Sequence, residues 1–256
     1  MDYRIHPLDE RTWMIEEYDE NTSVYMYLLE GEERAMLIDT GIGTVPLDKV
    51  TGELTRRPVD VINTHGHIDH IGGNGMFHNV YMHEADKEVY AYHCGDFRKF
   101  FPMAAYPEQP EEIQWFTGEL QFDLGGRILS VIHTPGHTYG SICILDSAKK
   151  WLFTGDTCCK GSILLALDYS APLETYHASV KKLLKRKEEY ITTWPGHHAY
   201  PVNTQVIEQF EEAATLLLEG KAEGEKTKTP LGEANVFLYK DIIVSYHPER
   251  LYGERG

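Results

Sequence analysis

The stretch from His65 to His70, with the sequence His-Gly-His-Ile-Asp-His, constrains the fold more than any other part of this 256-residue chain. A short apolar segment, residues 59–64, leads into it, and a glycine-rich turn follows it. Side chains two residues apart on an extended chain point the same way, so His65 and His67 can hold one metal ion. Asp69 and His70 come after the chain bends and can face a second ion. The stretch therefore predicts a strand that ends at a metal site.

This clustering is more informative than any single histidine of the chain. A lone histidine is more often a polar surface or core residue than a ligand. Three histidines and an aspartate at this spacing, at the end of a strand, rarely arise for packing reasons. Two divalent ions held close together can share and deprotonate one water molecule. The cluster therefore indicates a hydrolytic site.

The rest of the chain predicts an α+β architecture, because strand-like segments come in two series, each followed by helices. We expect one domain over residues 1–256, built from two mixed sheets packed together with helices outside. An aromatic segment at about 84–116 contains three prolines and is expected to form a helical insertion with loops. The polar segment 219–230 is expected to be an exposed connection. The expected strands are 23–29, 34–39, 59–64, 80–83, 120–124, 127–133, 141–145, 150–154, 190–194, 235–239 and 242–246, and the expected helices are about 46–55, 173–189 and 204–219.

One cluster cannot complete two metal sites, because catalytic zinc usually has at least three protein ligands and a solvent molecule. The missing ligands are expected at other strand ends, beside small residues that let loops converge. Three strand ends carry a histidine or an aspartate directly after glycine. These residues are His137, Asp156 and His197.

The ordered set resembles the metallo-β-lactamase-fold hydrolase superfamily. The pattern of that family is an aspartate after an early strand, then His-x-His-x-Asp-His, a histidine, an aspartate and a final histidine. The resemblance covers about residues 25–197 and implies a four-layer αββα sandwich with the metals at one edge between the sheets. The matching residues, in order, are Asp39, the stretch from His65 to His70, His137, Asp156 and His197.

The resemblance also implies a role for each matching residue. The first metal is held by His65, His67 and His137. The second is held by Asp69, His70 and His197. Asp156 bridges both metals, and Asp39 orients the metal-site loops through hydrogen bonds, although a turn-forming aspartate before glycine explains Asp39 equally well. His198 competes with His197, since both follow Gly196, and the family pattern favours His197. Zinc is the expected metal at both sites, and iron or manganese would also suit imidazole and carboxylate ligands.

The function that this resemblance implies is hydrolysis of a small ester, thioester or lactone by a hydroxide that bridges two metals. Asp69 would orient the hydroxide and carry a proton to the leaving group. Several alternatives stay open: a persulfide dioxygenase of the same fold with one iron, a phosphodiesterase, a β-lactam hydrolase and a metal-holding protein without turnover. The complete second site argues against the dioxygenase, which uses only the ligands of the first site.

The bond that is cut is less constrained than the metal site. Residues 153–157 resemble glyoxalase-II-like thioesterases, but the basic residues that bind glutathione have no convincing match, although Lys160 lies nearby. Lactonases of this fold often carry a tyrosine at the position of Cys159. The aromatic insertion offers a wall for a partly apolar substrate, or its rings pack the insertion onto the domain. The residues expected in a substrate pocket are Tyr90, Phe97, Cys159, Lys160 and His198.

Composition limits the partners. The net charge of −16 would repel phosphate backbones, so we expect a small-molecule substrate and no nucleic acid. No apolar run is long enough to span a membrane, and the N-terminus lacks the pattern of a signal peptide, so the expected location is the cytoplasm. The four cysteines do not suggest a disulfide framework. The oligomeric state is left open.

Overall fold

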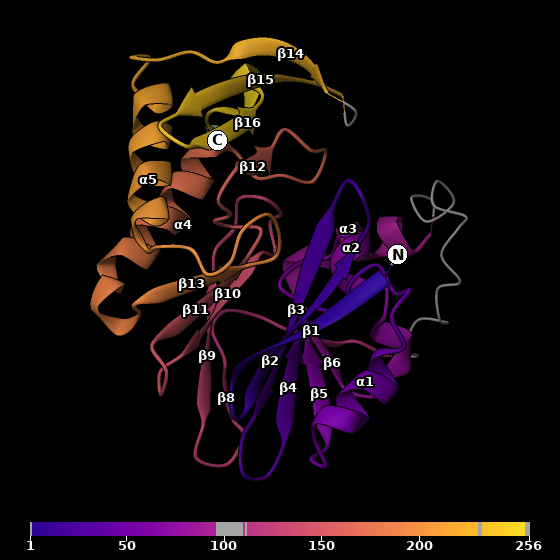
Figure 1. Cartoon of the computed structure of the whole chain (residues 1–256). Coiled ribbons are helices and arrows are strands. Elements are labelled where there is room, and N and C mark those ends of the chain that lie inside the picture. The colour runs from indigo at the N-terminus through magenta and orange to yellow at the C-terminus, as the bar shows by residue number, and fades with distance from the viewer. Residues whose placement is uncertain (1, 96–109, 111, 230–231, 254–256) are drawn as a thin grey trace.

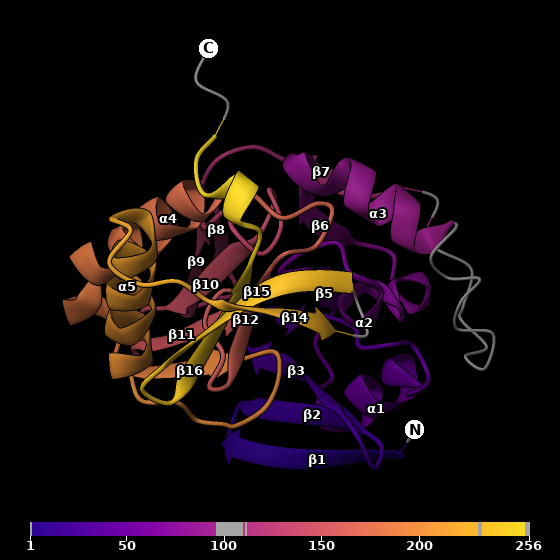
Figure 2. The same ribbon diagram turned by 90° about the horizontal axis from the view of Figure 1, so that it is seen from above.

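Two β-sheets pack face to face, and helices cover the outer face of each, in the computed structural model of the chain (Figure 1). The structure describes residues 2–95, 110, 112–229 and 232–253. Seen from above, α4 and α5 lie on one side of the strands and α1 and α3 lie on the other (Figure 2). The layers therefore follow the order helix, sheet, sheet, helix.

The first sheet is built from the N-terminal strands. Neighbouring strands pair antiparallel from β1 to β4 and parallel from β4 to β7. Its strands in spatial order are β1 (Asp2–Asp9), β2 (Thr12–Tyr18), β3 (Ser23–Glu30), β4 (Ala35–Ile38), β5 (Val59–Ile62), β6 (Val80–His83) and β7 (Gln114–Phe116). The helices of this half are α1 (Leu47–Leu54), α2 (Ile68–Ile71) and α3 (Lys87–Cys94), with short 3₁₀ turns η1 (Asn74–Met76) and η2 (Glu84–Asp86).

The second half contains two sheets. The five-stranded sheet packs on the first sheet, and its order is β13 (Thr192–Pro195), β11 (Trp151–Gly155), β10 (Ile142–Asp146), β9 (Ile128–His133) and β8 (Gln121–Asp123). A four-stranded sheet beside α5 has the order β12 (Ser162–Leu165), β16 (Ile242–Tyr246), β15 (Gly232–Tyr239) and β14 (Glu225–Thr229). The helices of this half are α4 (Leu173–Lys185) and α5 (Gln205–Leu218), and the 3₁₀ turns are η4 (Lys187–Glu189) and η5 (Pro248–Arg250).

Alternation along the central strands explains why the two main sheets stack. In β10, Ile142 and Ile144 face the first sheet, whereas Cys143 and Leu145 face α4 and α5. Strand β3 alternates in the same way, with Tyr27 between the sheets and its neighbours under the helices of the first half. Strands that are apolar on both faces need cover on both faces, and the sandwich supplies it.

The expected α+β sandwich and its helices are confirmed, and five strands were not predicted, one of them β7 at the end of the aromatic segment. Strands β1 and β2 carry many charged and polar residues, and β12 is short. The segment 219–230, expected to be an exposed connection, contains the polar edge strand β14. Thus a small third sheet stands beside the two expected ones. Some strands of this third sheet contain too few apolar residues for the sequence pattern to predict them.

The aromatic insertion is described only in part. Its start forms η2 and α3, and its end forms β7 of the first sheet. Phe97 and the other aromatic residues between 96 and 109 lie outside the described residues. None of the described helices is both long and apolar enough to cross a membrane.

A stacked pair of histidines bridges the two main sheets. His83 ends β6 and His133 ends β9, and their ring centroids lie 3.9 Å apart at 15°. Burial first, and then the neighbouring His133, lower the pKa of His83 to about 4. Burial also lowers the pKa of His133. Both rings are therefore neutral partners in the folded protein at neutral pH.

The pair should make the stability of the protein depend on acid. An unfolded histidine titrates near 6.5, so the pair's contribution is present above that pH and is lost as pH falls towards about 4. The free energy of unfolding can be measured with urea, in the presence of a chelator, at steps from pH 7.5 to pH 4.5. Over this range it should fall less for His83→Phe than for the unchanged chain. His78→Gln alters an exposed histidine and serves as the control. Equal losses in all three proteins would contradict this role of the pair.

Candidate metal centre

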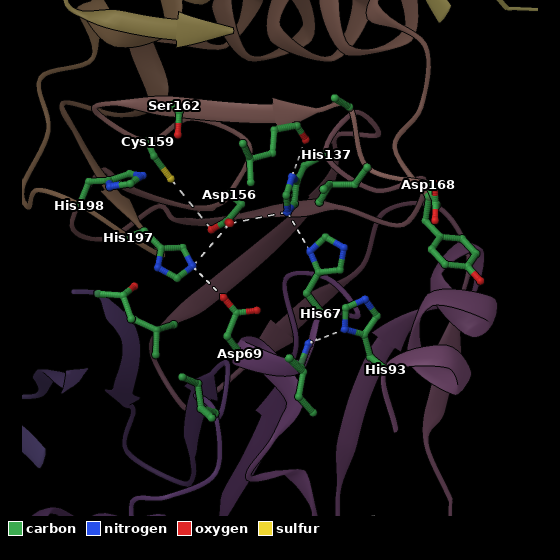
Figure 3. Close-up of a pocket in the computed structure, with 18 of the residues that line it drawn as sticks. His67, Asp69, His93, His137, Asp156, Cys159, Ser162, Asp168, His197 and His198 are labelled. Carbon is green, nitrogen blue, oxygen red and sulfur yellow. Dashed lines mark hydrogen bonds and ion pairs between the residues drawn. The ribbon is translucent and has the colours of Figure 1, made fainter. Parts of the chain in front are cut away.

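The predicted metal ligands come together at one edge of the sandwich. Figure 3 labels those that face the pocket: His67, Asp69, His137, Asp156 and His197. The stretch from His65 to His70 follows β5 and enters the short helix α2. His137 follows β9, Asp156 follows β11 and His197 follows β13. Loops from both sheets therefore meet where these strands end.

The first group contains His65, His67 and His137. His67 Nδ1 lies 3.1 Å from His65 Nε2 and 2.9 Å from His137 Nε2. All three side chains are buried. Three ring nitrogens therefore point at one small volume, which is the arrangement that a tetrahedral metal site needs.

The second group contains Asp69, His70 and His197. His197 Nε2 lies 3.2 Å from His70 Nε2 and 3.2 Å from Asp69 Oδ2. Asp156 stands between the two groups: its Oδ1 is 3.5 Å from His70 Nε2, and its Oδ2 is 3.6 Å from both His137 Nε2 and His197 Nε2. The seven side chains therefore form two adjoining groups that share one carboxylate.

Hydrogen bonds on the outer side of the rings fix which nitrogen carries the proton. His137 Nδ1 donates to the carbonyl oxygen of Leu164 at 2.8 Å, and His197 Nδ1 donates to that of Ser23 at 2.7 Å. A carbonyl oxygen can only accept, so in the neutral ring the proton stays on Nδ1 and the lone pair is on Nε2. Figure 3 shows both rings turned towards Asp156.

Asp39 fixes the orientation of His70 in the second group through a hydrogen bond to its outer nitrogen. Its Oδ2 accepts from His70 Nδ1 at 2.8 Å and from the Thr64 hydroxyl at 2.7 Å. Its Oδ1 accepts from the Thr64 backbone N–H at 2.7 Å. Because the Thr64 hydroxyl donates to Asp39, it accepts from His65 Nδ1 at 3.1 Å. Asp39 therefore orients two of the histidines, directly and through Thr64.

Charge is distributed unequally between the groups. Burial and neighbouring histidines hold the pKa values of His65 and His67 well below the usual range. Burial acts in the same direction on His70 and His197, but carboxylates outweigh it: Asp39 and Asp156 raise the pKa of His70 to about 9, and Asp156 and Asp69 raise that of His197 to about 10. The second group therefore favours a cation more strongly.

These donors fit divalent metal ions. Imidazole lone pairs that face one another at about 3 Å repel unless a cation lies between them, and several of these lone pairs are fixed by outer hydrogen bonds. Three sets of ligand atoms lie within 4.8 Å of one another: His65, His67 and His137; His65, His70 and Asp156; and Asp69, His70 and His197. The nitrogen and carboxylate donors suit zinc, iron and manganese.

His67, Asp69, His137, Asp156 and His197 line a pocket of about 690 Å³, whereas His65 and His70 are buried and do not line it. Of the residues expected in a substrate pocket, Cys159 and His198 line it. Tyr90 does not line this pocket and packs against Trp115, with ring centroids 5.7 Å apart. Lys160 does not line it either, and its Nζ lies 3.9 Å from Asp241 Oδ2 at the surface. Phe97 lies outside the described residues.

Cys159 belongs to the wall of the pocket. It is buried, and its Sγ lies 4.0 Å from Asp156 Oδ1. Burial, and then the charge of Asp156, raise the pKa of the Cys159 thiol well above its usual value. The thiol is therefore protonated and has little nucleophilic character. Cys158 points into the other core, under α4 and α5.

Sequence reasoning missed the opposite wall of the pocket. Tyr92 and His93 come from α3, and Leu164 and residues 166–169 come from the end of β12 and the loop after it, whereas Leu165 packs in the core with α4 and α5. The backbone N–H of Ile68 donates to His93 Nδ1 at 3.1 Å, and the ring centroid of His93 lies 4.8 Å from that of His67. The only available signal was the position of His93 in an aromatic segment, which does not place it beside the metal ligands.

Known proteins match the chain over most of its length. A family model described as the metallo-beta-lactamase superfamily matches residues 20–197. The acyl-coenzyme A thioesterase MBLAC2 of Gallus gallus is 30% identical over 222 residues, which cover 75% of this chain and 79% of that protein. A probable polyketide biosynthesis zinc-dependent hydrolase, BaeB, of Bacillus velezensis is 28% identical over 193 residues, covering 72% of this chain and 76% of its own.

A solved structure gives the same result for the fold. The metallo-beta-lactamase from Pontibacter korlensis superposes with a TM-score of 0.66 at 20% identity, covering 84% of this chain and 99% of that one. The matched residues 20–197 include all seven side chains of the two groups. The chain belongs to the metallo-β-lactamase superfamily and is a metal-dependent hydrolase.

Proposed function

We propose that the chain hydrolyses small acyl thioesters with two zinc ions held by the seven side chains. One observation carries the proposal: seven side chains converge in two groups, and five of them line a largely apolar pocket. Two divalent ions bound there would lower the pKa of a shared water and polarise the substrate carbonyl. The protein's own contribution is to hold the donors in place and to exclude bulk water from the reacting bond.

Asp69 is the residue best placed to move a proton. Its side chain is 33% exposed, against 0% for His70 and 16% for Asp156, so it faces the pocket more openly than these neighbours. Burial would raise its pKa, but His70 and His197 outweigh that effect and hold the pKa well below the usual value. A carboxylate in this position can accept a proton from the attacking water and pass it to the leaving group.

The lining of the pocket favours a neutral, apolar acyl group. Among the described residues that line it, none is lysine or arginine, whereas Asp69, Asp156 and Asp168 are carboxylates. Apolar side chains from several elements make up much of the rest: Val24, Ile42, Ile68, Leu164, Ala166 and Leu167. An acyl chain that carries a carboxylate would therefore find no lysine or arginine side chain to pair with its negative charge, and we expect it to bind less well.

The relatives support a thioester as the substrate. The Gallus gallus relative named above is an acyl-coenzyme A thioesterase, and GloC of Haemophilus influenzae, 26% identical over 67% of this chain and 83% of its own length, is named a hydroxyacylglutathione hydrolase. Both names describe thioester substrates. A thiolate is also a good leaving group, because a thiol has a pKa near 8.5, so the reaction demands little of a general acid.

Removal of the metals should abolish activity without unfolding the protein. Dialysis against a chelator should reduce thioester hydrolysis to the background rate, and zinc should restore it. Elemental analysis of chain purified without added metal should give about two zinc per chain. One iron per chain with oxygen consumption would contradict the proposal and favour the dioxygenase.

The variant Asp69→Asn separates catalysis from metal binding. We expect kcat for an acyl thioester to fall about 10²-fold or more, because the amide cannot accept the proton. Zinc content, measured on the same preparation, should fall much less. Proportional losses of zinc and of kcat would mean that Asp69 acts only as a ligand.

The pocket lining predicts selectivity among acyl groups. On one thiol carrier, kcat/KM for a neutral butyryl or hexanoyl thioester should exceed that for a succinyl thioester by at least about tenfold, since an unpaired charge costs 1.4 kcal/mol or more. Lys160→Ala, outside the pocket, should leave this ratio unchanged, whereas Ala166→Arg should narrow it. A succinyl thioester that is hydrolysed as well as the neutral ones would contradict the predicted selectivity.

A further inference from the structure

Asp86 is a buried carboxylate beside the first metal group that the proposed reaction does not use. It closes the 3₁₀ turn η2, directly before α3, and is fully buried. Its Oδ2 accepts from the Gly66 backbone N–H at 2.8 Å and from the Thr138 hydroxyl at 2.8 Å. Its Oδ1 accepts from the Gly140 backbone N–H at 2.7 Å.

The partners of Asp86 belong to the loops that carry the first metal group. Gly66 lies between His65 and His67, and Thr138 directly follows His137. The first loop comes from the first sheet and the second loop from the other sheet. One carboxylate therefore ties together the loops that bring all three histidines of this group to one place.

The packing around Asp86 leaves little freedom. A Cβ atom on Gly140 would lie 2.6 Å from Asp86 Cγ, and one on Gly66 would lie 3.1 Å from the backbone nitrogen of Tyr90 in α3. His93, which also belongs to α3, accepts a hydrogen bond from the Ile68 backbone N–H. The loop from His65 to Asp69 thus rests directly on η2 and α3, and Asp86 is the charged contact between them.

The second metal group has a different support. Asp39 orients His70 there, and Ser23 orients His197 through its backbone carbonyl. Asp86 contacts neither of these histidines in any recorded hydrogen bond or ion pair among the described residues. Asp86 therefore supports the loops of the first group alone, whereas Asp39 orients His70 of the second group directly and His65 of the first group only through Thr64.

We propose that Asp86 is a positioning residue that sets the metal affinity of the first group, largely independently of the second. The inference rests on the ligand groups of the proposed function. In Asp86→Asn, whichever way the amide is turned, its NH₂ faces a backbone N–H, either that of Gly66 or that of Gly140. The hydrogen bond to one of the two loops is then lost, and the nitrogen atoms of the three histidines no longer point at one position.

The test measures metal affinity in chains that keep one group at a time. The metal-free protein is titrated with Co²⁺, followed by visible absorption and checked by elemental analysis. His197→Ala keeps the first group, and His67→Ala keeps the second. Adding Asp86→Asn should weaken Co²⁺ binding about 10- to 100-fold in the His197→Ala chain and less than about twofold in the His67→Ala chain. Circular dichroism and thermal melting check that each variant is folded.

A matched control separates positioning from general destabilisation. Asp146 is as buried as Asp86, and its side chain accepts a hydrogen bond from Arg127 at 2.6 Å. It stands at the end of β10 that lies away from the metal groups, because the other end of this strand, at Ile142, is the one bonded to Thr64 beside the site. Asp146→Asn should lower the melting temperature without changing either Co²⁺ affinity. Equal weakening of both groups by Asp86→Asn, or no weakening, would overturn the inference.

Failure of the dinuclear proposal gives a different result. An unchanged chain that takes up only one Co²⁺ would overturn the two-metal proposal. The role of Asp86 would still be decided, because the His197→Ala chain retains His65, His67 and His137. Loss of affinity there on adding Asp86→Asn supports the inference, and unchanged affinity overturns it.

Discussion

The hydrogen bonds on the outer nitrogens of the site histidines determine what the inner nitrogens can do. His137 and His197 each donate Nδ1–H to a backbone carbonyl, and His70 donates to Asp39. Each bond fixes a tautomer and a ring orientation, so a lone pair points inward. Lone pairs aimed at one another are unfavourable without a cation, and the rest of the fold must hold them there.

The packing of the two sheets provides that support. Ser23, whose carbonyl orients His197, belongs to the first sheet, whereas His197 follows a strand of the second. Other hydrogen bonds cross between the two halves at the same edge: Tyr27 Oη donates to the Pro195 carbonyl at 2.6 Å, and Ile142 N–H donates to the Thr64 carbonyl at 2.9 Å. The site is thus part of the interface between the sheets, and loosening the sandwich would misalign the ligands.

Sequence patterns predicted the parts of this arrangement that depend on local chemistry. The spacing of the residues from His65 to His70, and glycine before His137, Asp156 and His197 in the chain, were sufficient to predict convergence at strand ends. The glycines have a visible reason: a Cβ on Gly196 would lie 2.6 Å from Asp156 Oδ1. Alternating apolar residues likewise predicted the central strands. The polar edge strands carry no such pattern, because an edge strand is stabilised mainly by backbone pairing.

Long-range partners were beyond the reach of the sequence. Nothing near Asp86 indicates that it accepts from Gly66 and Gly140, which are 20 and 54 residues away. The same holds for the pocket wall that His93 and Tyr169 form from separate segments. Tyr90 lies among aromatic residues in the sequence and Lys160 lies near Asp156, but neither lines the pocket, because nearness in sequence does not determine which face of an element a side chain occupies.

The division between metal ligands and pocket wall has a functional consequence. The proposed ligands stand at strand ends, where the packing of the two sheets fixes them, so we expect substitutions there to disturb the fold as well. Much of the wall comes from α3 and from the loop after β12, which the core constrains far less. Substitutions there can alter the acyl group that is accepted while the metal centre stays intact. We therefore expect the acyl selectivity of this chain to be set at Tyr92, His93, Leu164 and residues 166–169, which line the pocket.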